Sequence, residues 1–363
     1  METIDRRIQP TERLVSLDAF RGMTMIFLIS SSFGLSLLRD HPTLGFLGRQ
    51  FTHHPWNGLY FWDLIQPFFM FIVGVAMPFS FAKRWERGET WNQSLVHVIR
   101  RSLTLLFLGV LLHCWYNKAY VWELWNVLTQ LSVTYLLAFL FMKKPIRTQI
   151  IISFAILLFN YLAYRFIPLP GVTDAWEKDS NLGAFMDRIL MGKINPGGGW
   201  VTINVIGSTA HTMWGVIAGI VLMSDRPQMK KVAQIAIAGA IGVILGLALD
   251  PITPIIKRIC TSSFIFISGG WALLALALFY WIVDVKGYKK WTKFLLVVGM
   301  NSIFIYMFVN LLGGWSNEFV GIFDKPFLDP LGLFGKIVHR NLVLAFYWYL
   351  CWWLYKRKIF IRI

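Results

Sequence analysis

The clearest indication of a membrane fold is the segment Leu59-Tyr-Phe-Trp-Asp63-Leu-Ile-Gln-Pro67-Phe-Phe-Met-Phe-Ile-Val-Gly74. It opens an apolar run that continues to residue 82, long enough to cross about 30 Å of hydrocarbon as one helix. Directly before it stands Thr52-His53-His54-Pro55-Trp56-Asn57-Gly58. Ionisable groups at or in a membrane are costly and usually have a task. Two histidines beside an acid-bearing span therefore predict a functional site at this place.

The composition indicates an integral membrane protein. Hydrophobic residues make up 56% of the 363 residues and charged residues only 15%, and the mean hydropathy is +0.56; soluble domains carry far more charge. Residues 1–15 are polar, and the first apolar run is too long for a signal peptide, so we expect no cleaved leader. The three cysteines are scattered through apolar segments, which predicts buried thiols and neither a disulfide nor a metal framework.

Apolar runs of about 20 residues recur along the chain, and each is long enough to span a bilayer. They lie at 16–38, 59–82, 98–115, 121–142, 148–167, 200–223, 232–250, 262–283, 294–313 and 336–355. The sequence therefore predicts an all-α, polytopic transmembrane helix bundle of about ten spans, or eleven if 315–335 forms an interfacial or re-entrant helix. We expect 1–363 to form one membrane domain, with 168–199 as its longest outer loop.

The distribution of Lys and Arg predicts the orientation of these spans. With the N-terminus in the cytoplasm, the inner segments carry 22 of the 35 basic residues, as the positive-inside rule requires. Residues 1–15 then form a cytoplasmic N-terminal segment, and the C-terminus is cytoplasmic as well. The same bias accounts for most of the net charge of +16. The positive charge therefore does not indicate a nucleic-acid partner, since no basic groove with interleaved aromatics stands apart from the loops.

His53 and Asp63 are the strongest candidates for chemistry. A nearby carboxylate orients an imidazole ring and tunes its pKa, so His53 could act as a general base or acid near neutral pH. The structural alternative is a pair of loop histidines, His53 and His54, at the level of the lipid headgroups. A proton-coupled transporter that uses Asp63, His53 and His211 as a relay also fits the residue types.

Other polar residues in or near the spans have structural explanations beside functional ones. Asp18 and Arg21 are spaced i,i+3 on one helix face and would neutralise each other. His211 would hydrogen-bond between helices, and Asn301 would serve packing in the same way. Lys257 and Arg258 would lie at the interface with their charged ends in water.

Several motifs along the chain resemble one family. They are Arg13-Leu-Val-Ser-Leu17-Asp18-Ala-Phe-Arg21-Gly22, His53-x-x-Trp56-Asn57-Gly58-x-x-x-x-Asp63-Leu-x-x-Pro67-Phe-x-x-Phe71-Ile-x-Gly74, Val127-Leu128-x-Gln130-Leu-x-Val133-Thr134-Tyr135, Met186-Asp187-Arg188-Ile-Leu-Met-Gly192, Pro254-x-x-Lys257 with Ser262-Ser263-Phe264, Val283-Asp284-Val285-Lys286-Gly287, and Gly299-Met300-Asn301-Ser302-Ile303. In combination they resemble the heparan-α-glucosaminide N-acetyltransferase family over roughly residues 13–310.

The resemblance implies an enzyme that transfers an acetyl group from acetyl-CoA to a glucosamine-like amine, or to a hydroxyl, at the outer face of a membrane. The family's catalytic histidine opens the H-x-x-W motif, so His53 would be general base or acetyl carrier, with Asp63 beside it and no metal. We expect contacts to acetyl-CoA from Lys257, Arg258, Ser262 and Asn301. We expect contacts to a sugar or glycan acceptor from His54, Trp56, Asn57, Asn204 and His211.

The resemblance further implies the cytoplasmic membrane of a bacterium, contact with membrane lipids and a homodimer, although no small-xxx-small seam marks an interface. At three places the sequence differs from the motifs of this family, and these differences bear on the substrates. Ser30-Ser31-Ser32-Phe33-Gly34 replaces a segment with an Asn, Thr129-Gln130 replaces a Gln-Arg pair, and Asn195-Pro-Gly-Gly-Gly199 replaces an Asp-Pro-x-Gly stretch. They leave open a non-catalytic scaffold. Two routes for acetyl-CoA to His53 also stay open. The donor could thread from the cytoplasm with its phosphates near Arg100 and Arg101, or the site could open outward with Lys257 and Arg258 at the phosphates. Threading is favoured because the donor is cytoplasmic.

Overall fold

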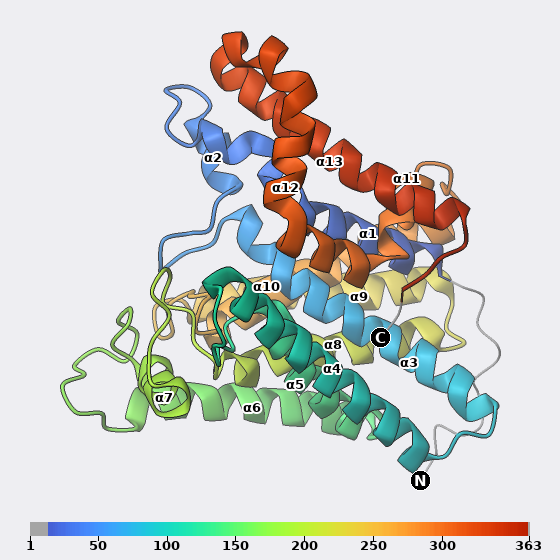
Figure 1. Ribbon diagram of the computed structural model, residues 1–363. Helices are drawn as coiled ribbons and strands as arrows, with labels where there is room; N and C mark the ends of the chain where they lie inside the picture. Colours follow the sequence, from blue (N-terminus) through green and yellow to red (C-terminus); the bar gives the residue numbers. More distant parts are fainter. Residues whose placement is uncertain (1–13, 362–363) are drawn as a thin grey trace. The chain divides into compact units, whose positions relative to one another are not determined.

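The computed structural model describes residues 14–361, which contain helices and no strand (Figure 1). The α-helices are α1 (Val15–Ile29), α2 (Gly45–Gln50), α3 (Ile65–Glu86), α4 (Trp91–Asn117), α5 (Val127–Met142), α6 (Ile146–Phe166), α7 (Leu182–Met191), α8 (Asn204–Met223), α9 (Gln228–Leu249), α10 (Ser262–Phe279), α11 (Thr292–Gly299), α12 (Ser302–Leu328) and α13 (Gly332–Lys356). Shorter turns of helix are η2 (Ser31–Leu38), η3 (Phe61–Leu64), η4 (Tyr280–Val285) and η5 (Asp329–Leu331). The prediction of an all-α protein is confirmed for this part of the chain.

Each of the ten predicted apolar runs is largely helical, but the count of ten spans is not confirmed. Within residues 14–361, six helices are long and apolar enough to cross a membrane, or up to eight if each of two bent helix pairs counts as one span. One reason is that α5 has only 16 residues. Another is that α1 and η2 meet at a bend of 56°, and α11 is bent by 70° from the helices after it. The orientation of the termini stays a prediction.

Local sequence signals set several helix ends. Thr90 and Gln93 form a capping box at the start of α4, in which each side chain satisfies a backbone N–H of the first turn. Asn126 caps α5 by accepting from the N–H groups of Leu128 and Thr129. The predicted outer loop 168–199 contains α7, which Asn181 caps at its start. Within the stretch 315–335, α12 continues to residue 328 and α13 begins at residue 332, and whether this stretch is interfacial or re-entrant stays a prediction.

The described chain forms two compact units. The first unit holds residues 56–58 and 70–278, and the second holds 14–55, 59–69 and 279–361. In the first unit, α8 packs against α5 and α6, and α4 packs against α5. Gly74 of α3 and Gly215 of α8 allow a close backbone crossing: a Cβ on Gly74 would lie 2.1 Å from the carbonyl oxygen of Thr212, and one on Gly215 equally close to that of Phe71. Small residues permit this approach.

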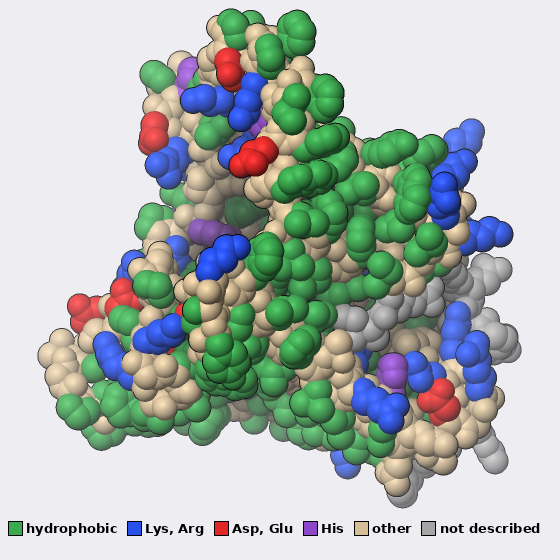
Figure 2. All heavy atoms as spheres, in the orientation of Figure 1, with side chains coloured by type: hydrophobic (Ala, Val, Ile, Leu, Met, Phe, Trp, Pro, Cys, Tyr) green, Lys and Arg blue, Asp and Glu red, His purple; other side chains and the backbone are tan. Residues whose placement is uncertain are grey.

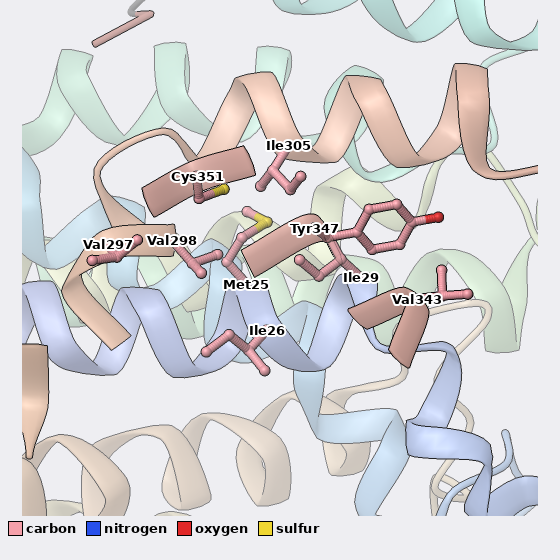
Figure 3. Packing of buried hydrophobic residues seen from close by; sticks show 9 residues of the cluster. All are labelled: Met25, Ile26, Ile29, Val297, Val298, Ile305, Val343, Tyr347 and Cys351. Carbon is pink, nitrogen blue, oxygen red and sulfur yellow. The ribbon is translucent and has the colours of Figure 1, made fainter. Parts of the chain in front are cut away.

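The second unit is built on α1, α11 and the hairpin of α12 and α13. Its core joins side chains from all four helices (Figure 3), namely Met25, Ile26, Ile29, Val297, Val298, Ile305, Val343, Tyr347 and Cys351. Gly22 lies against α11 so closely that a Cβ would meet the carbonyl oxygen of Leu295 at 2.0 Å. The expected pair of Asp18 and Arg21 forms on α1, with 2.5 Å between Oδ1 and Nη2.

The outward faces of three helices in the first unit are suited to lipid. Only 28% of the apolar window of α4 is buried, and 22% of that of α6 and of α9. Large apolar side chains such as Phe107, Ile151 and Ile244 are more than three-fifths exposed there, and Figure 2 shows hydrophobic side chains over much of the visible face. Apolar surface of this extent needs a lipid or protein neighbour.

Candidate functional site

The side chains of His53 and Asp63 form a hydrogen-bonded pair in the second unit. Nδ1 of His53 lies 2.9 Å from Oδ1 of Asp63. The carboxylate is almost fully buried, whereas the imidazole side chain is 43% exposed. A carboxylate accepts hydrogen bonds, so the pair places the proton of the neutral ring on Nδ1 and makes Nε2 the basic nitrogen. This arrangement suits a histidine that takes up and releases a proton.

Asp63 is held in place by the start of a helix. It belongs to η3, whose turn runs on into α3, and Oδ2 accepts the backbone N–H groups of Tyr60 at 3.0 Å and His54 at 3.1 Å. The positive end of the helix dipole further favours an ionised carboxylate at this position. Asp63 therefore orients His53 from a rigid element, while His53 itself stands on a loop.

His54 occupies a different environment from its neighbour. Its ring packs edge-on against Tyr60, with 4.6 Å between the ring centroids. Nδ1 of His54 is buried and has no hydrogen-bond partner among the described residues. The backbone of His54 thus helps to hold Asp63, but its imidazole lacks the carboxylate partner that His53 has.

The H-x-x-W motif is divided between the units, because Trp56, Asn57 and Gly58 belong to the first one. The indole N–H of Trp56 donates to the carbonyl oxygen of Trp176 at 2.8 Å. The N–H of Gly58 donates to the carbonyl oxygen of Ile255 at 2.8 Å. Asn57 is exposed. These bonds fasten the segment to the loops after α6 and α9.

Lys257 and Arg258 follow α9 in the first unit and share an aromatic neighbour. Lys257 is buried, so the expectation that its charged end lies in water is wrong. The Lys257 ammonium lies 5.4 Å from the ring centroid of Trp200, and the Arg258 guanidinium carbon 6.0 Å. Asn204, at the first residue of α8, donates to the carbonyl oxygen of Arg258 at 3.3 Å. A lysine and an arginine held side by side are of the type that binds phosphate groups.

Gln130 connects α5 to this loop through a buried polar network. Its Nε2 donates to Oδ1 of Asn204 at 2.9 Å and to Oγ of Ser208 at 3.0 Å. The loop itself turns at Cys260, a residue with a φ of 50°, whose carbonyl oxygen accepts from Asn160. Burial raises the pKa of the Cys260 thiol to about 12, so this cysteine is a structural thiol and no nucleophile.

Three further predicted site residues bond to neighbouring groups of the fold. Nε2 of His211 lies 2.8 Å from Oγ of Ser268, between α8 and α10. Ser262 donates to the carbonyl oxygen of Leu157. The amide of Asn301 both donates to Ile359 and accepts from the N–H of Ile361, which ties the C-terminal segment to the start of α12. These bonds give all three side chains structural tasks.

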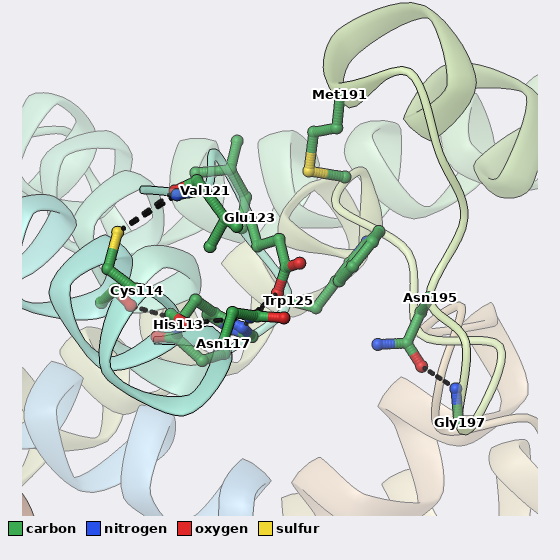
Figure 4. A network of polar contacts seen from close by, with 12 residues as sticks. His113, Cys114, Asn117, Val121, Glu123, Trp125, Met191, Asn195 and Gly197 are labelled. Atoms are coloured by element: carbon green, nitrogen blue, oxygen red, sulfur yellow. Dashed lines mark hydrogen bonds and ion pairs between the residues drawn. The ribbon is translucent and has the colours of Figure 1, made fainter. Parts of the chain in front are cut away.

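A charged cluster at the end of α4 was not predicted (Figure 4). Glu123 lies 2.7 Å from Nδ1 of His113 and 2.5 Å from Nζ of Lys193. Burial alone would raise the pKa of the Glu123 carboxyl. The hydrogen bond from Lys193 and the charge of His113 outweigh that effect, and the pKa lies below its ordinary value. The cluster joins α4 to the loop after α7.

Asp187 of α7, also within the first unit, behaves in the opposite way. It is fully buried and accepts from the indole N–H of Trp125 at 2.6 Å and from the N–H of Thr202 at 3.0 Å. Burial raises the pKa of this carboxyl in spite of both hydrogen bonds. The only sequence signal for it was its place in the Met186–Gly192 motif.

The second unit contains another unpredicted histidine–aspartate pair. Nδ1 of His339 on α13 lies 2.8 Å from Oδ2 of Asp324 on α12. Fifteen residues separate the two, and no spacing rule relates them before the hairpin is known. Between residues 14 and 361, no three His, Cys, Asp or Glu side chains gather where they could hold a metal ion.

The apolar helices and the acid-oriented histidine define a polytopic helical membrane protein with a candidate proton-transfer site. The family described as heparan-alpha-glucosaminide N-acetyltransferase, catalytic, matches residues 13–173, a range that includes both His53 and Asp63. Two proteins named heparan-alpha-glucosaminide N-acetyltransferase are each 25% identical to the chain: the Mus musculus protein over 99% of the chain and 62% of its own length, and the Homo sapiens protein over 97% and 60%. The chain is thus similar to heparan-alpha-glucosaminide N-acetyltransferases along nearly its whole length, and it spans about three-fifths of the length of these relatives.

Proposed function

We propose that the protein is a transmembrane acetyltransferase that moves an acetyl group from acetyl-CoA to a sugar amine or hydroxyl. The observation that carries the proposal is the 2.9 Å contact between Nδ1 of His53 and Oδ1 of Asp63 inside the segment that matches the family. The relatives' name supplies the acetyl group and the glucosaminide acceptor as chemical classes.

In the first mechanism His53 acts as a general base. Nε2 removes a proton from the acceptor amine as its nitrogen attacks the thioester carbonyl of acetyl-CoA. The tetrahedral intermediate then collapses with cleavage of the carbon–sulfur bond, and the protonated ring returns the proton to the leaving thiolate. Asp63 stabilises the imidazolium that forms between these steps, as the acid of a Ser-His-Asp triad does.

In the second mechanism Nε2 of His53 attacks the thioester itself and becomes acetylated, with release of the CoA thiolate. The acceptor amine then attacks the acetyl-imidazole, the carbon–nitrogen bond to the ring breaks, and the amine's proton passes to the imidazole. The half-exposed ring of His53 is compatible with both routes. They differ in whether the protein carries the acetyl group in the absence of acceptor.

For the donor, Lys257 and Arg258 are the residues we propose for the CoA phosphates. Two cations with a shared Trp200 neighbour fit a diphosphate and an adenine ring. For the acceptor, we propose Trp56 and the exposed Asn57, because aromatic and amide groups suit a sugar. The site is proposed to face the outer side of the membrane, in accordance with the charge distribution of the loops.

The test uses purified full-length protein with radiolabelled acetyl-CoA and a panel of glucosamine acceptors. His53→Ala should lower the transfer rate by about 10²- to 10⁴-fold, whereas His54→Ala, the matched neighbour, should keep transfer within a few-fold of the parent. Label that stays on the protein after denaturation without acceptor, and is absent in His53→Ala, would select the acetyl-histidine route.

Acetyl-CoA should also stabilise the folded protein, by about 2.7 kcal/mol at one hundred times its Kd. Lys257→Gln should reduce this stabilisation, measured as the difference in unfolding temperature between the variant with acetyl-CoA and the same variant without it. Equal loss of transfer in His53→Ala and His54→Ala would contradict the assignment of His53. Solute flux in proteoliposomes without any acetyl-CoA would contradict the acetyltransferase proposal and favour a transporter.

A further inference from the structure

The ends of α3, α4 and α5 that the charge distribution predicts to be cytoplasmic carry a concentration of positive charge. Residues 83–101 and 143–147 contain eight Lys or Arg and two acids, namely Lys83, Arg84, Arg87, Arg100, Arg101, Lys143, Lys144 and Arg147 against Glu86 and Glu89. Figure 2 shows such a group of Lys and Arg side chains around one His, at the lower right where α3 ends and α4 begins. We call Arg84, Arg100, Arg101, Lys143 and Lys144 the basic corner.

Aromatic rings hold one of these cations in place. Nζ of Lys143 lies 4.2 Å from the ring centroid of Trp85 and 5.3 Å from that of Trp91. The two indoles are 6.2 Å apart, and Trp91 in turn stacks on Phe139 at 4.3 Å. The ammonium contacts both indoles and is still exposed, so its N–H donors remain available to an anion.

Arg101 adds a cation on α4, about three turns after Trp91. Its guanidinium carbon lies 4.6 Å from the ring centroid of Tyr135. Its Nε is buried and has no hydrogen-bond partner among the described residues. A buried guanidinium N–H without an acceptor is costly, so the described residues leave this cation incompletely satisfied. The positive-inside rule explains the number of charges here but neither this burial nor the Trp85–Trp91 contact.

An apolar stripe on α4 begins beside Arg100, one residue of the basic corner. Ile99, Leu103 and Phe107 are spaced by four residues, so they lie on one helix face, and they are 40%, 59% and 65% exposed. The exposed Arg100 directly follows the first of them. A group of cations next to an exposed apolar stripe matches the charged headgroup and the acyl chain of a phospholipid. A free phosphate would contact only the cations.

We propose that the basic corner binds the headgroup of an anionic phospholipid, whose acyl chain lies along Ile99, Leu103 and Phe107. Basic pockets between transmembrane helices on the cytoplasmic side are the type of site that holds such headgroups. The lipid site lies within the first unit and does not depend on the acetyltransferase proposal.

The test measures thermal unfolding of the full chain in mild detergent during titration with phosphatidylglycerol or phosphatidylcholine. Phosphatidylglycerol should raise the unfolding temperature at far lower concentration than phosphatidylcholine. Removing one positive charge should weaken the apparent affinity for phosphatidylglycerol about fivefold. The double variant Lys143→Gln, Arg101→Gln should therefore bind it about 25-fold more weakly. Lys143→Arg keeps the charge and should keep the affinity.

The chain offers a matched control at the other end of the same helix. Lys118 places its ammonium 3.9 Å from the ring centroid of Trp115, and Lys118→Gln should leave the affinity for phosphatidylglycerol unchanged. If the double variant does not fold, Lys144→Gln, on an exposed residue, should still cost about fivefold. Equal stabilisation by both lipids, or equal loss in Lys118→Gln, would refute the site. Displacement of phosphatidylglycerol by CoA or inorganic phosphate would overturn it in favour of a site for free phosphates.

Discussion

Oδ1 of Asp63 lies 2.9 Å from Nδ1 of His53, across a loop of nine intervening residues. The Asp63 carboxylate is buried and held by two backbone N–H groups. The His53 ring is partly exposed and hydrogen-bonded to that carboxylate. The pair therefore has one fixed and one accessible member, an arrangement that suits a candidate proton-transfer site.

Asp63→Asn should preserve the fold locally but change the proton position on His53. The asparagine amide can donate to Nδ1, which would move the ring proton to Nε2 and remove its basicity. We expect kcat for acetyl transfer to fall by about 10²- to 10⁴-fold, with a much smaller change in KM. A variant whose kcat equals that of the parent at pH 7 would show that Asp63 does not orient the base.

The Glu123 cluster should make stability depend on pH at the acid end. Because the pKa of Glu123 is lowered in the folded protein, its contribution is present above its unfolded pKa of about 4.3 and is lost as pH falls through the folded value. Glu123→Gln should cost about 1–3 kcal/mol at pH 7 and flatten the fall in unfolding temperature below about pH 5. An equally steep fall in the variant would assign the acid sensitivity to other groups.

Asp187 should show the reverse dependence. Its pKa is raised in the folded protein, so its contribution is full below the unfolded pKa of about 3.9 and declines as pH rises through the raised folded value. Asp187→Asn should therefore increase the unfolding temperature at pH 7 relative to that at pH 4, when each is compared with the parent. The two acids form an internal control, because their variants should tilt the pH profile in opposite directions.

Gly74→Ala should destabilise the first unit. The added Cβ would lie 2.1 Å from the carbonyl oxygen of Thr212, so α3 and α8 would have to separate, at a cost of about 1–3 kcal/mol. The matched control is Gly314→Ala in α12, where nothing lies within 4 Å of the added atom and the helix gains up to about 1 kcal/mol in propensity. Thermal unfolding in detergent compares the two, and equal shifts would contradict the close crossing.

Gln130→Leu tests the buried polar network. The change leaves Asn204 and Ser208 without their donor, and unsatisfied buried groups cost about 1–3 kcal/mol. Gln234→Ala, on an exposed face of α9, should stay within about 0.5 kcal/mol. If Gln130 supports the Lys257–Arg258 loop, KM for acetyl-CoA should rise in Gln130→Leu while it stays constant in the control.

The amino-acid sequence alone indicated the membrane class, the positions of the apolar segments and the similarity to the acetyltransferases, because hydropathy and motif order are local properties summed along the chain. It did not determine the number of spans. The bends at the ends of α1 and α11 and the short α5 depend on which helices pack together, and apolar length alone does not reveal this.

The tertiary structure decided which side chains meet. Hydropathy treats His53 and His54 alike, and a motif selected His53, but only the path of the loop turns one ring towards Asp63. The same holds for Asn301, whose amide binds the C-terminal segment, and for Asp324 with His339 in the α12–α13 hairpin. Contacts between residues far apart in sequence arise only when the backbone brings them together, whereas the tendency of each segment to enter a membrane is carried by its own residues.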